Sequence, residues 1–299
     1  MRAIAAAMLL LLAVGTPAQA RETLGFGRLF TNDLIGDGYD RWRSGSYQWS
    51  LVRGPGWTGT RPPEAGRVME YRFRSEIISP TRLNGEGSRS RLYVGLLAAG
   101  AHTHATAGAA EISLGADLVF LGPQTGWSAL QAEVHERTDA PRVRQEGNEI
   151  ENRTLPHGTA EVAWPIRSGG VTFRPFVEAQ AGTETILRTG ADLLWGPVGE
   201  GNLLTRDHVT GHLIRAVEGP ETGLALVLGG DIARVESSLY LPEDGTADLL
   251  PESTRLHGGV HWQVAPDVSF FYGATWLSEE FEGQEEGQVT GSLKLNVSF

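Results

Sequence analysis

The sequence predicts an all-β protein, a transmembrane antiparallel β-barrel of about twelve strands with a short helix in an extracellular loop. Three observations indicate this fold. Apolar and polar residues alternate in segments of about ten residues, short turns and long polar loops separate these segments, and no long stretch repeats at helical period. Alternation is expected because one face of each barrel strand meets lipid while the other faces the lumen.

The last segment shows the alternation most clearly. Val289, Leu293, Leu295, Val297 and Phe299 point one way, and the polar residues between them point the other. A final strand that ends on phenylalanine resembles the C-terminal signature of bacterial outer-membrane barrels. We expect strands near residues 24–32, 43–52, 67–77, 90–100, 110–120, 159–168, 171–182, 185–195, 222–236, 253–264, 268–277 and 287–299. An even number of strands suits a closed barrel, which leaves no unpaired backbone edge in lipid.

The connections support the same topology. Residues 168–170 and 265–267 are short turns, whereas 121–158 and 237–252 are long and polar. Short periplasmic turns that alternate with longer extracellular loops are typical of outer-membrane barrels. Residues 196–221 do not fit this pattern, because they form a long connection on the predicted periplasmic side.

Residues 1–20 predict a secretory signal peptide. Arg2 precedes an apolar run from Ala3 to Val14, and the small-residue pattern Ala18-Gln19-Ala20 predicts cleavage after Ala20. The apolar run is too short to span a bilayer. We therefore expect residues 21–299 to form the barrel domain, in the outer membrane of a Gram-negative bacterium.

Composition excludes several kinds of function. The chain has no cysteine, so disulfides, thiol catalysis and thiolate-bound metals play no part. Its 36 Asp and Glu residues outnumber its 25 Lys and Arg residues, and the net charge of −11 argues against nucleic acid as a partner. An acidic exported protein can still act at an anionic surface if divalent cations bridge the two.

Two polar clusters are expected at the extracellular end of the barrel. Asn32 and Asp33 end the first strand, and Ser44 begins the second. In the loop from Gly122 to Glu136, a short helix would carry Gln131 and His135 four residues apart on one face. Histidine can accept a proton near neutral pH. The alternatives are a hydrophilic turn rich in Asp and Gly, and a solvated loop histidine.

The other histidines considered have structural interpretations. His102 and His104 are spaced to share one strand face, but they fall in a predicted periplasmic turn, and we expect them to be structural or solvent-exposed. His257 and His261 share one face of the tenth predicted strand, and we expect them to line the lumen.

Several motifs together resemble the lipid A 3'-O-deacylase family of outer-membrane barrels. They keep their order over most of the mature chain. They are "ND" at Asn32-Asp33, "DR..SG" at residues 40–45, "SP" at Ser79-Pro80, "GP..G....Q...H" at residues 122–135, "IENR" at residues 150–153 and "SEEF.GQ" at residues 278–284.

This resemblance implies a calcium-dependent enzyme that hydrolyses the ester of the 3'-linked acyloxyacyl group of lipid A. The implied catalytic base is His135, with Gln131 beside it on the loop helix. Asn32, Asp33 and Ser44 are the other implied site residues and the candidate calcium ligands. Lipid A or lipopolysaccharide is the implied substrate, surrounding outer-membrane lipids are expected to contact the barrel, and we expect a monomer.

Two departures from the family pattern concern the site. The family carries an acidic residue about six positions after the histidine, where this chain has Pro141, so Glu136 or Asp139 would have to complete the metal shell. The tryptophan motif that precedes "IENR" in the family is absent. The alternative functions are a calcium-dependent outer-membrane phospholipase, whose His and Ser-Asn signature is missing, and a non-catalytic porin or structural barrel.

Overall fold

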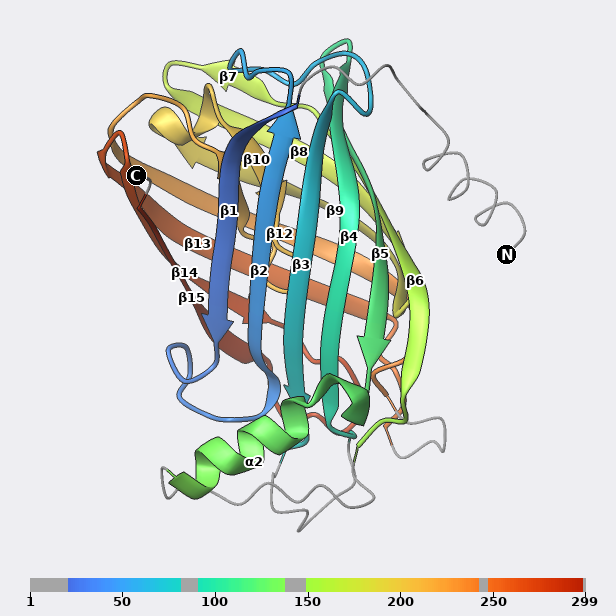
Figure 1. The fold of residues 1–299 in the computed structure, drawn as a ribbon. Helices are drawn as coiled ribbons and strands as arrows, with labels where there is room; N and C mark the ends of the chain where they lie inside the picture. The colour runs from blue at the N-terminus through green and yellow to red at the C-terminus, as the bar shows by residue number, and fades with distance from the viewer. Residues whose placement is uncertain (1–20, 82–90, 138–148, 242–246, 298–299) are drawn as a thin grey trace.

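The computed structural model describes residues 21–81, 91–137, 149–241 and 247–297 (Figure 1). The predicted signal peptide in residues 1–20 and the terminal Phe299 lie outside the described residues. Among the helices of the described ranges, none is long and apolar enough to cross a membrane.

One antiparallel sheet forms the wall and closes on itself where β6 pairs with β8. Around the barrel the order is β6-β5-β4-β3-β2-β1-β15-β14-β13-β12-β9-β8. These twelve strands are β1 (Glu22–Asn32), β2 (Trp42–Gly54), β3 (Val68–Ser79), β4 (Val94–Ala107), β5 (Ala110–Leu121), β6 (Arg153–Ala163), β8 (Val171–Ala181), β9 (Glu184–Trp195), β12 (Gly223–Ser238), β13 (Glu252–Ala265), β14 (Val268–Leu277) and β15 (Gln288–Val297). The short β7 (Ile166–Ser168) pairs only with the start of β8. The predicted twelve-stranded barrel is confirmed.

The two faces of the wall differ as the alternation predicted. On β12 the side chains of Leu224, Leu228 and Ile232 point outward and are about 60 % exposed, whereas Val227 and Asp231 are buried in the lumen. An apolar outer surface of this kind is stable only against lipid.

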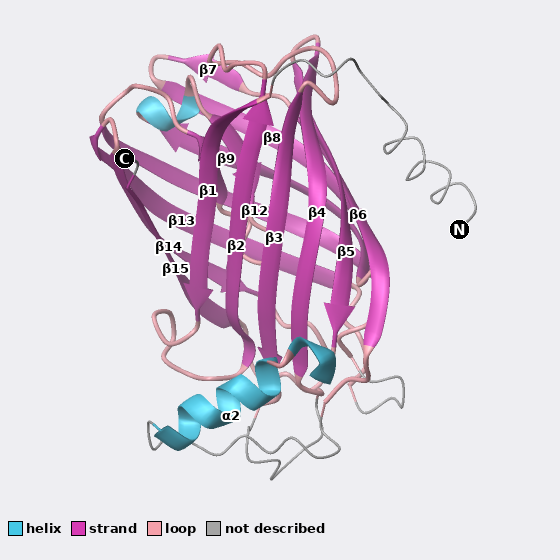
Figure 2. Cartoon of the chain, in the orientation of Figure 1, coloured by secondary structure: helices cyan, strands magenta, loops and turns pink. Residues whose placement is uncertain are grey.

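The two ends of the barrel carry different additions (Figure 2). At one end, the helix end, the turn η1 (Pro123–Thr125) leads into α2 (Trp127–Arg137), which confirms the predicted loop helix. At the opposite end the turn η2 (Pro197–Gly199) is followed by a hairpin of β10 (Leu203–Arg206) and β11 (Leu213–Val217). We call this hairpin, residues 203–217, the plug.

The plug explains why residues 196–221 are too long for a periplasmic turn, because they fold back into the lumen. Arg206 near the plug tip forms ion pairs with Glu161 at 2.6 Å and Asp192 at 2.8 Å on the wall. A Cβ on Gly25 would come within 2.5 Å of the Ala216 carbonyl oxygen, so only glycine lets β1 and the plug approach so closely. This packing could not be predicted from local sequence patterns.

The lumen side of the wall is polar and paired. His102 lies 2.9 Å from Asp117, and His104 lies 2.9 Å from Glu70. Both histidines belong to β4, which runs to Ala107, so the prediction that they fall in a turn is wrong. The strand continues because alternate residues of this stretch still find buried partners in the lumen. The predicted lumen position of His257 and His261 is confirmed, since both are buried there beside the plug.

Candidate functional site

The loop helix α2 lies at the helix end of the barrel and runs from beside the ends of β4 and β5 to the β1–β2 hairpin (Figure 1). A Cβ on Gly95 of β4 would come within 2.5 Å of the Thr125 hydroxyl oxygen and 3.0 Å of the Trp127 Cβ atom. This glycine therefore lets the start of the helix sit directly on the wall. One side of α2 faces the β1–β2 hairpin, where Gln131 and His135 contact Asp40.

Asn32 shapes the β1–β2 hairpin with both ends of its amide. Its Oδ1 accepts a hydrogen bond from the Leu34 backbone N–H at 2.9 Å, and its Nδ2 donates to the Ser44 carbonyl oxygen at 2.9 Å. Side-chain to backbone bonds of the first kind are typical of turns that begin at Asn. Asn32 thereby fixes the start of the loop that carries the other site residues.

Asp33 is almost fully buried behind this turn. Its Oδ2 accepts a hydrogen bond from the Arg41 backbone N–H at 3.0 Å and lies 3.2 Å from the Ser44 hydroxyl oxygen. Burial, opposed by the hydrogen bond from Arg41 and reinforced by the charge of Asp40, raises the pKa of the Asp33 carboxyl to about 7. Asp33 is therefore a carboxylate whose negative charge lacks sufficient compensation.

The Asp40 side chain connects the β1–β2 hairpin to α2. In the sequence, Asp40 is recognisable only as part of the hairpin motif. Its carboxylate accepts hydrogen bonds from the Ser44 hydroxyl and from Gln131 Nε2 at 3.2 Å, and it lies 3.2 Å from His135 Nε2. Of the predicted residues, His135, Gln131 and Ser44 thus meet at one carboxylate, which Ser44 links to Asp33. The sequence feature that could have indicated a role for Asp40 is its position in a turn, four residues before Ser44.

The contact with Asp40 defines the orientation of the imidazole ring. Because Nε2 faces the carboxylate, a neutral His135 places its proton on Nε2 and its lone pair on Nδ1. The ring side chain is about 12 % exposed, so it is held in place yet reachable from outside the barrel. A histidine oriented by a carboxylate in this way is suited to accept a proton through its other nitrogen.

Comparison with known proteins identifies the family. The profile described as "Outer membrane protein LpxR" matches residues 4–299. The chain belongs to the LpxR family of outer-membrane proteins. The family and the transmembrane barrel place this LpxR-family protein in the outer membrane of a Gram-negative bacterium.

One solved structure agrees with this assignment at the level of the fold. LpxR from Salmonella typhimurium superposes with a TM-score of 0.72 at 17 % identity, covering 92 % of this chain and all of that one. The translocator domain of the autotransporter NalP from Neisseria meningitidis gives 0.45 at 9 % identity, covering 100 % and 95 %. The NanC porin gives 0.42 at 8 % identity, covering 92 % and 100 %. No curated protein matches the sequence significantly.

The residues at the rim of this LpxR-family barrel fit a hard divalent cation. The single hydroxyl proton of Ser44 cannot satisfy Asp33 and Asp40 at once, and among the described residues no Lys or Arg side chain pairs with either carboxylate. The Gln131 Oε1 atom is buried without a hydrogen-bond partner. Calcium prefers carboxylate, amide and hydroxyl oxygens of this kind. The described residues contain no group of three His, Asp or Glu side chains with metal-binding geometry, so a cation at this rim would also have to bind these neutral oxygens.

Glu136 and Asp139 were the two acidic residues predicted as candidates to complete a metal shell. Glu136 lies on α2 with its side chain exposed, and Asp139 lies outside the described residues. Asp40 provides a carboxylate beside Asp33 instead.

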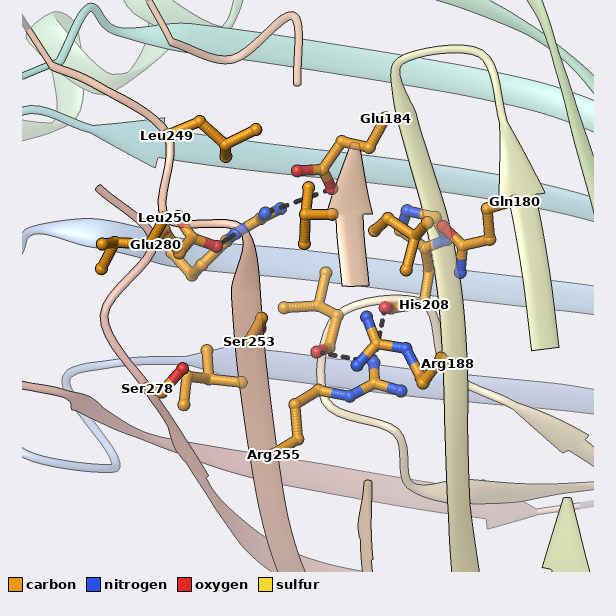
Figure 3. Close-up of a pocket in the computed structure, with 15 residues that line it drawn as sticks. Gln180, Glu184, Arg188, His208, Leu249, Leu250, Ser253, Arg255, Ser278 and Glu280 are labelled. Atoms are coloured by element: carbon orange, nitrogen blue, oxygen red, sulfur yellow. Dashed lines mark hydrogen bonds and ion pairs between the residues drawn. The ribbon is translucent and has the colours of Figure 1, made fainter. Parts of the chain in front are cut away.

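The lumen holds a separate cavity, shown in Figure 3, lined by Arg43, Arg188, Arg255 and His208 among others. Its volume of about 40 Å³ leaves room for only a few water molecules, since each needs roughly 10–15 Å³ of such space. The arginines are already paired, Arg255 with Asp231 at 3.0 Å and Arg43 with Glu280 at 2.7 Å. This cavity is too small and too fully paired to receive an acyl ester.

Proposed function

We propose that this LpxR-family protein is a lipid A deacylase that hydrolyses the ester of the 3'-linked acyloxyacyl group. Family membership and one observation carry the proposal: His135 on α2 and Asp40 on the β1–β2 hairpin lie 3.2 Å apart on the outer rim of the barrel. With the helix end of the barrel directed to the cell exterior, as we propose, this pair would lie at the level of the outer leaflet, where an acylated glycolipid resides.

In the proposed reaction, His135 acts as the general base. Its Nδ1 takes a proton from the water that attacks the ester carbonyl, and Asp40 stabilises the imidazolium that forms. The same ring then returns the proton to the leaving sugar oxygen, so the acyloxyacyl chain departs as a free acid. Gln131 and Ser44 hold Asp40 in place during both transfers.

The placement of α2 suits an amphiphilic substrate. Leu130 and Val134 on this helix are nearly half exposed, on the same element as His135. Acyl chains can stay beside this apolar surface and the outer wall while the ester reaches the polar rim. The enzyme would therefore act as a monomer on lipid A or lipopolysaccharide without extracting it from the membrane.

Calcium is the proposed cofactor. Asp33, Asp40, Ser44 and Gln131 would hold it, with Asn32 fixing the loop from which Asp33 projects. When bound, the cation supplies positive charge for the oxyanion that develops on the carbonyl oxygen. It also offsets the repulsion between an acidic protein and a phosphorylated glycolipid.

The plug is evidence against the alternative that the protein is a porin. In the plug, Arg206 pairs with Glu161 and His212 contacts Thr275, both on the wall. Lys294 of the wall donates to the Arg215 carbonyl oxygen of the plug at 3.3 Å. A porin needs a water-filled channel along this path.

The test uses purified protein with lipid A and, in parallel, a diacyl phospholipid. We expect release of the acyloxyacyl chain from lipid A alone, loss of that release with chelator, and recovery with added calcium. Phospholipid cleavage with intact lipid A would favour the phospholipase alternative. Turnover that persists in excess chelator would remove calcium from the proposal but leave the histidine mechanism.

A further inference from the structure

The chain between Asp40 and Ser44 has an unusual backbone. Trp42 has φ +52°, and among the described residues it alone is a non-glycine residue with positive φ. The pairing of β2 with β3 also shifts register between Arg43 and Gly45. In a regular strand, residues four apart are separated by about 13 Å. Here the Ser44 hydroxyl contacts the Asp40 carboxylate, so the kink at Trp42 brings the two side chains together.

Gln288, at the start of β15, forms hydrogen bonds with the chain on both sides of this kink. It is about 1 % exposed. Its Nε2 donates to the Arg41 carbonyl oxygen at 2.7 Å, and its Oε1 accepts from the Arg43 backbone N–H at 3.0 Å. One side-chain amide therefore binds the peptide groups on either side of Trp42, in the way that a neighbouring strand would.

The Trp42 side chain is fixed as well. Its ring is buried against Ala247 and Phe281, and its indole N–H donates to the Thr81 hydroxyl at 3.2 Å. The Arg41 guanidinium lies 4.2 Å from the ring centre. A left-handed conformation is strained for a bulky residue and persists only when its surroundings hold it. Loops distant in sequence thus stabilise a strained residue beside the candidate catalytic centre.

We propose that Gln288 clamps the left-handed backbone at Trp42 and thereby positions Asp40, and through Asp40 His135, for ester hydrolysis. The inference rests on the function proposed above. Gln288 is a positioning residue: its bonds determine the path of the chain from Asp40 to Ser44, and Asp40 in turn contacts His135. Gln288 belongs to the opposite end of the sequence from the hairpin, so neither the motifs nor the spacing indicated it.

The first variant, Gln288→Leu, removes both bonds of the clamp at similar side-chain volume. We expect kcat to fall by about ten- to a hundredfold, with KM nearly unchanged, because small misplacements of catalytic groups have effects of this size. The matched control is Gln263→Leu, which removes a buried amide of β13 that bonds Arg215 in the lumen at 2.6 Å. This control should keep its kcat. Heat-modifiability on gels verifies that both barrels are folded, and equal kcat in the two variants overturns the clamp.

A second variant tests the backbone itself. Glycine adopts positive φ without strain, so Trp42→Gly in the Gln288→Leu background should recover about tenfold of the lost kcat. A merely structural defect would instead worsen when the buried ring is removed. Absence of recovery would overturn the claim that Gln288 acts through the conformation at Trp42.

A third measurement does not depend on turnover. The other seven histidines lie in the lumen, so diethyl pyrocarbonate should modify His135 first, and peptide mass spectrometry can follow its rate. Gln288→Leu should raise that rate several-fold, whereas Gln263→Leu should leave it unchanged. An inactive wild-type protein would refute the proposed function, while this rate would still decide the clamp. An unchanged rate in Gln288→Leu overturns the clamp whatever the activity.

Discussion

The lumen and the outer rim of this barrel contain the same polar residue types in opposite states. In the lumen, Glu70 is paired with both His104 and Arg72, and Asp117 with both His102 and Arg74. At the rim, Asp40 meets one histidine and neutral donors, and Asp33 meets neutral donors only. Buried groups that are fully paired contribute to the fold, whereas incompletely compensated groups remain available for a substrate, a proton or a cation. The degree of pairing, more than residue type, separates the two regions.

The largest expected effect comes from exchanging the rim histidine. His135→Gln should lower ester hydrolysis by about two to four orders of magnitude, because a positioned acid-base group contributes that much. The barrel should still insert, since α2 lies outside the strand ladder. The lumen counterpart His104→Gln should retain activity, because Arg72 still pairs with Glu70. Near-normal hydrolysis by His135→Gln would place the base elsewhere.

Removing the charge at Asp33 should have the next largest effect. We expect Asp33→Asn to lose about a hundredfold in activity at low calcium, because the amide keeps the shape but not the charge that attracts the cation. Raising calcium should recover part of this loss. His135→Gln should show no such recovery, so a calcium series on both variants separates the two roles. Equal calcium responses would contradict the assignment of Asp33 as a ligand.

The pH dependence of calcium binding should reveal the same carboxyl group. Without a cation, Asp33 holds its proton below a pKa of about 7, so calcium must displace that proton. The half-saturating calcium concentration should therefore rise by up to about tenfold per unit as pH falls below 7, and it should level off above that value. Calorimetric titrations at several pH values measure this. A half-saturating calcium concentration that stays constant between about pH 5 and pH 7 would rule out competition between calcium and a proton on Asp33 in that range.

The smallest effect on activity is expected from breaking a lumen pair. Arg206→Met leaves Glu161 and Asp192 without this partner, and losing one member of a buried ion pair costs about 3–5 kcal/mol. The unfolding temperature on heat-modifiability gels should drop, while the folded fraction should keep its turnover. A loss of turnover without a loss of stability would show that the plug contributes to the rim chemistry.

The sequence predicted the parts of the fold that depend on local periodicity. Twelve wall strands and the helix carrying Gln131 and His135 were expected from alternation and spacing, because one face of each strand meets lipid and the other meets the lumen. Their bounds were less well predicted: β4 ends seven residues after its predicted end, and β6 begins six residues before its predicted start. The plug could not be predicted this way. Its hairpin is stabilised by ion pairs with strands that lie far away in the sequence. From local sequence patterns alone, its residues resemble a turn that is too long.

The candidate site was predictable in composition but not in its connections. The motifs gave Asn32, Asp33, Ser44, Gln131 and His135, and the structure gathers them at one rim, with their catalytic and calcium-binding roles remaining predictions. The contacts that Asp40 makes with the other site residues depend on the positive φ at Trp42. No sequence pattern predicts a positive φ for a tryptophan. A backbone conformation that depends on tertiary contacts cannot be predicted from the neighbouring residues in the sequence.

The most direct test of the central claim is mass spectrometry of lipid A from Gram-negative cells that express the wild-type protein, His135→Gln or His104→Gln. The account predicts loss of the 3'-linked acyloxyacyl group with the wild type and with His104→Gln, and intact lipid A with His135→Gln at equal levels in the outer membrane. Intact lipid A with the wild-type protein in calcium-replete membranes, or deacylation that persists in His135→Gln, would contradict it.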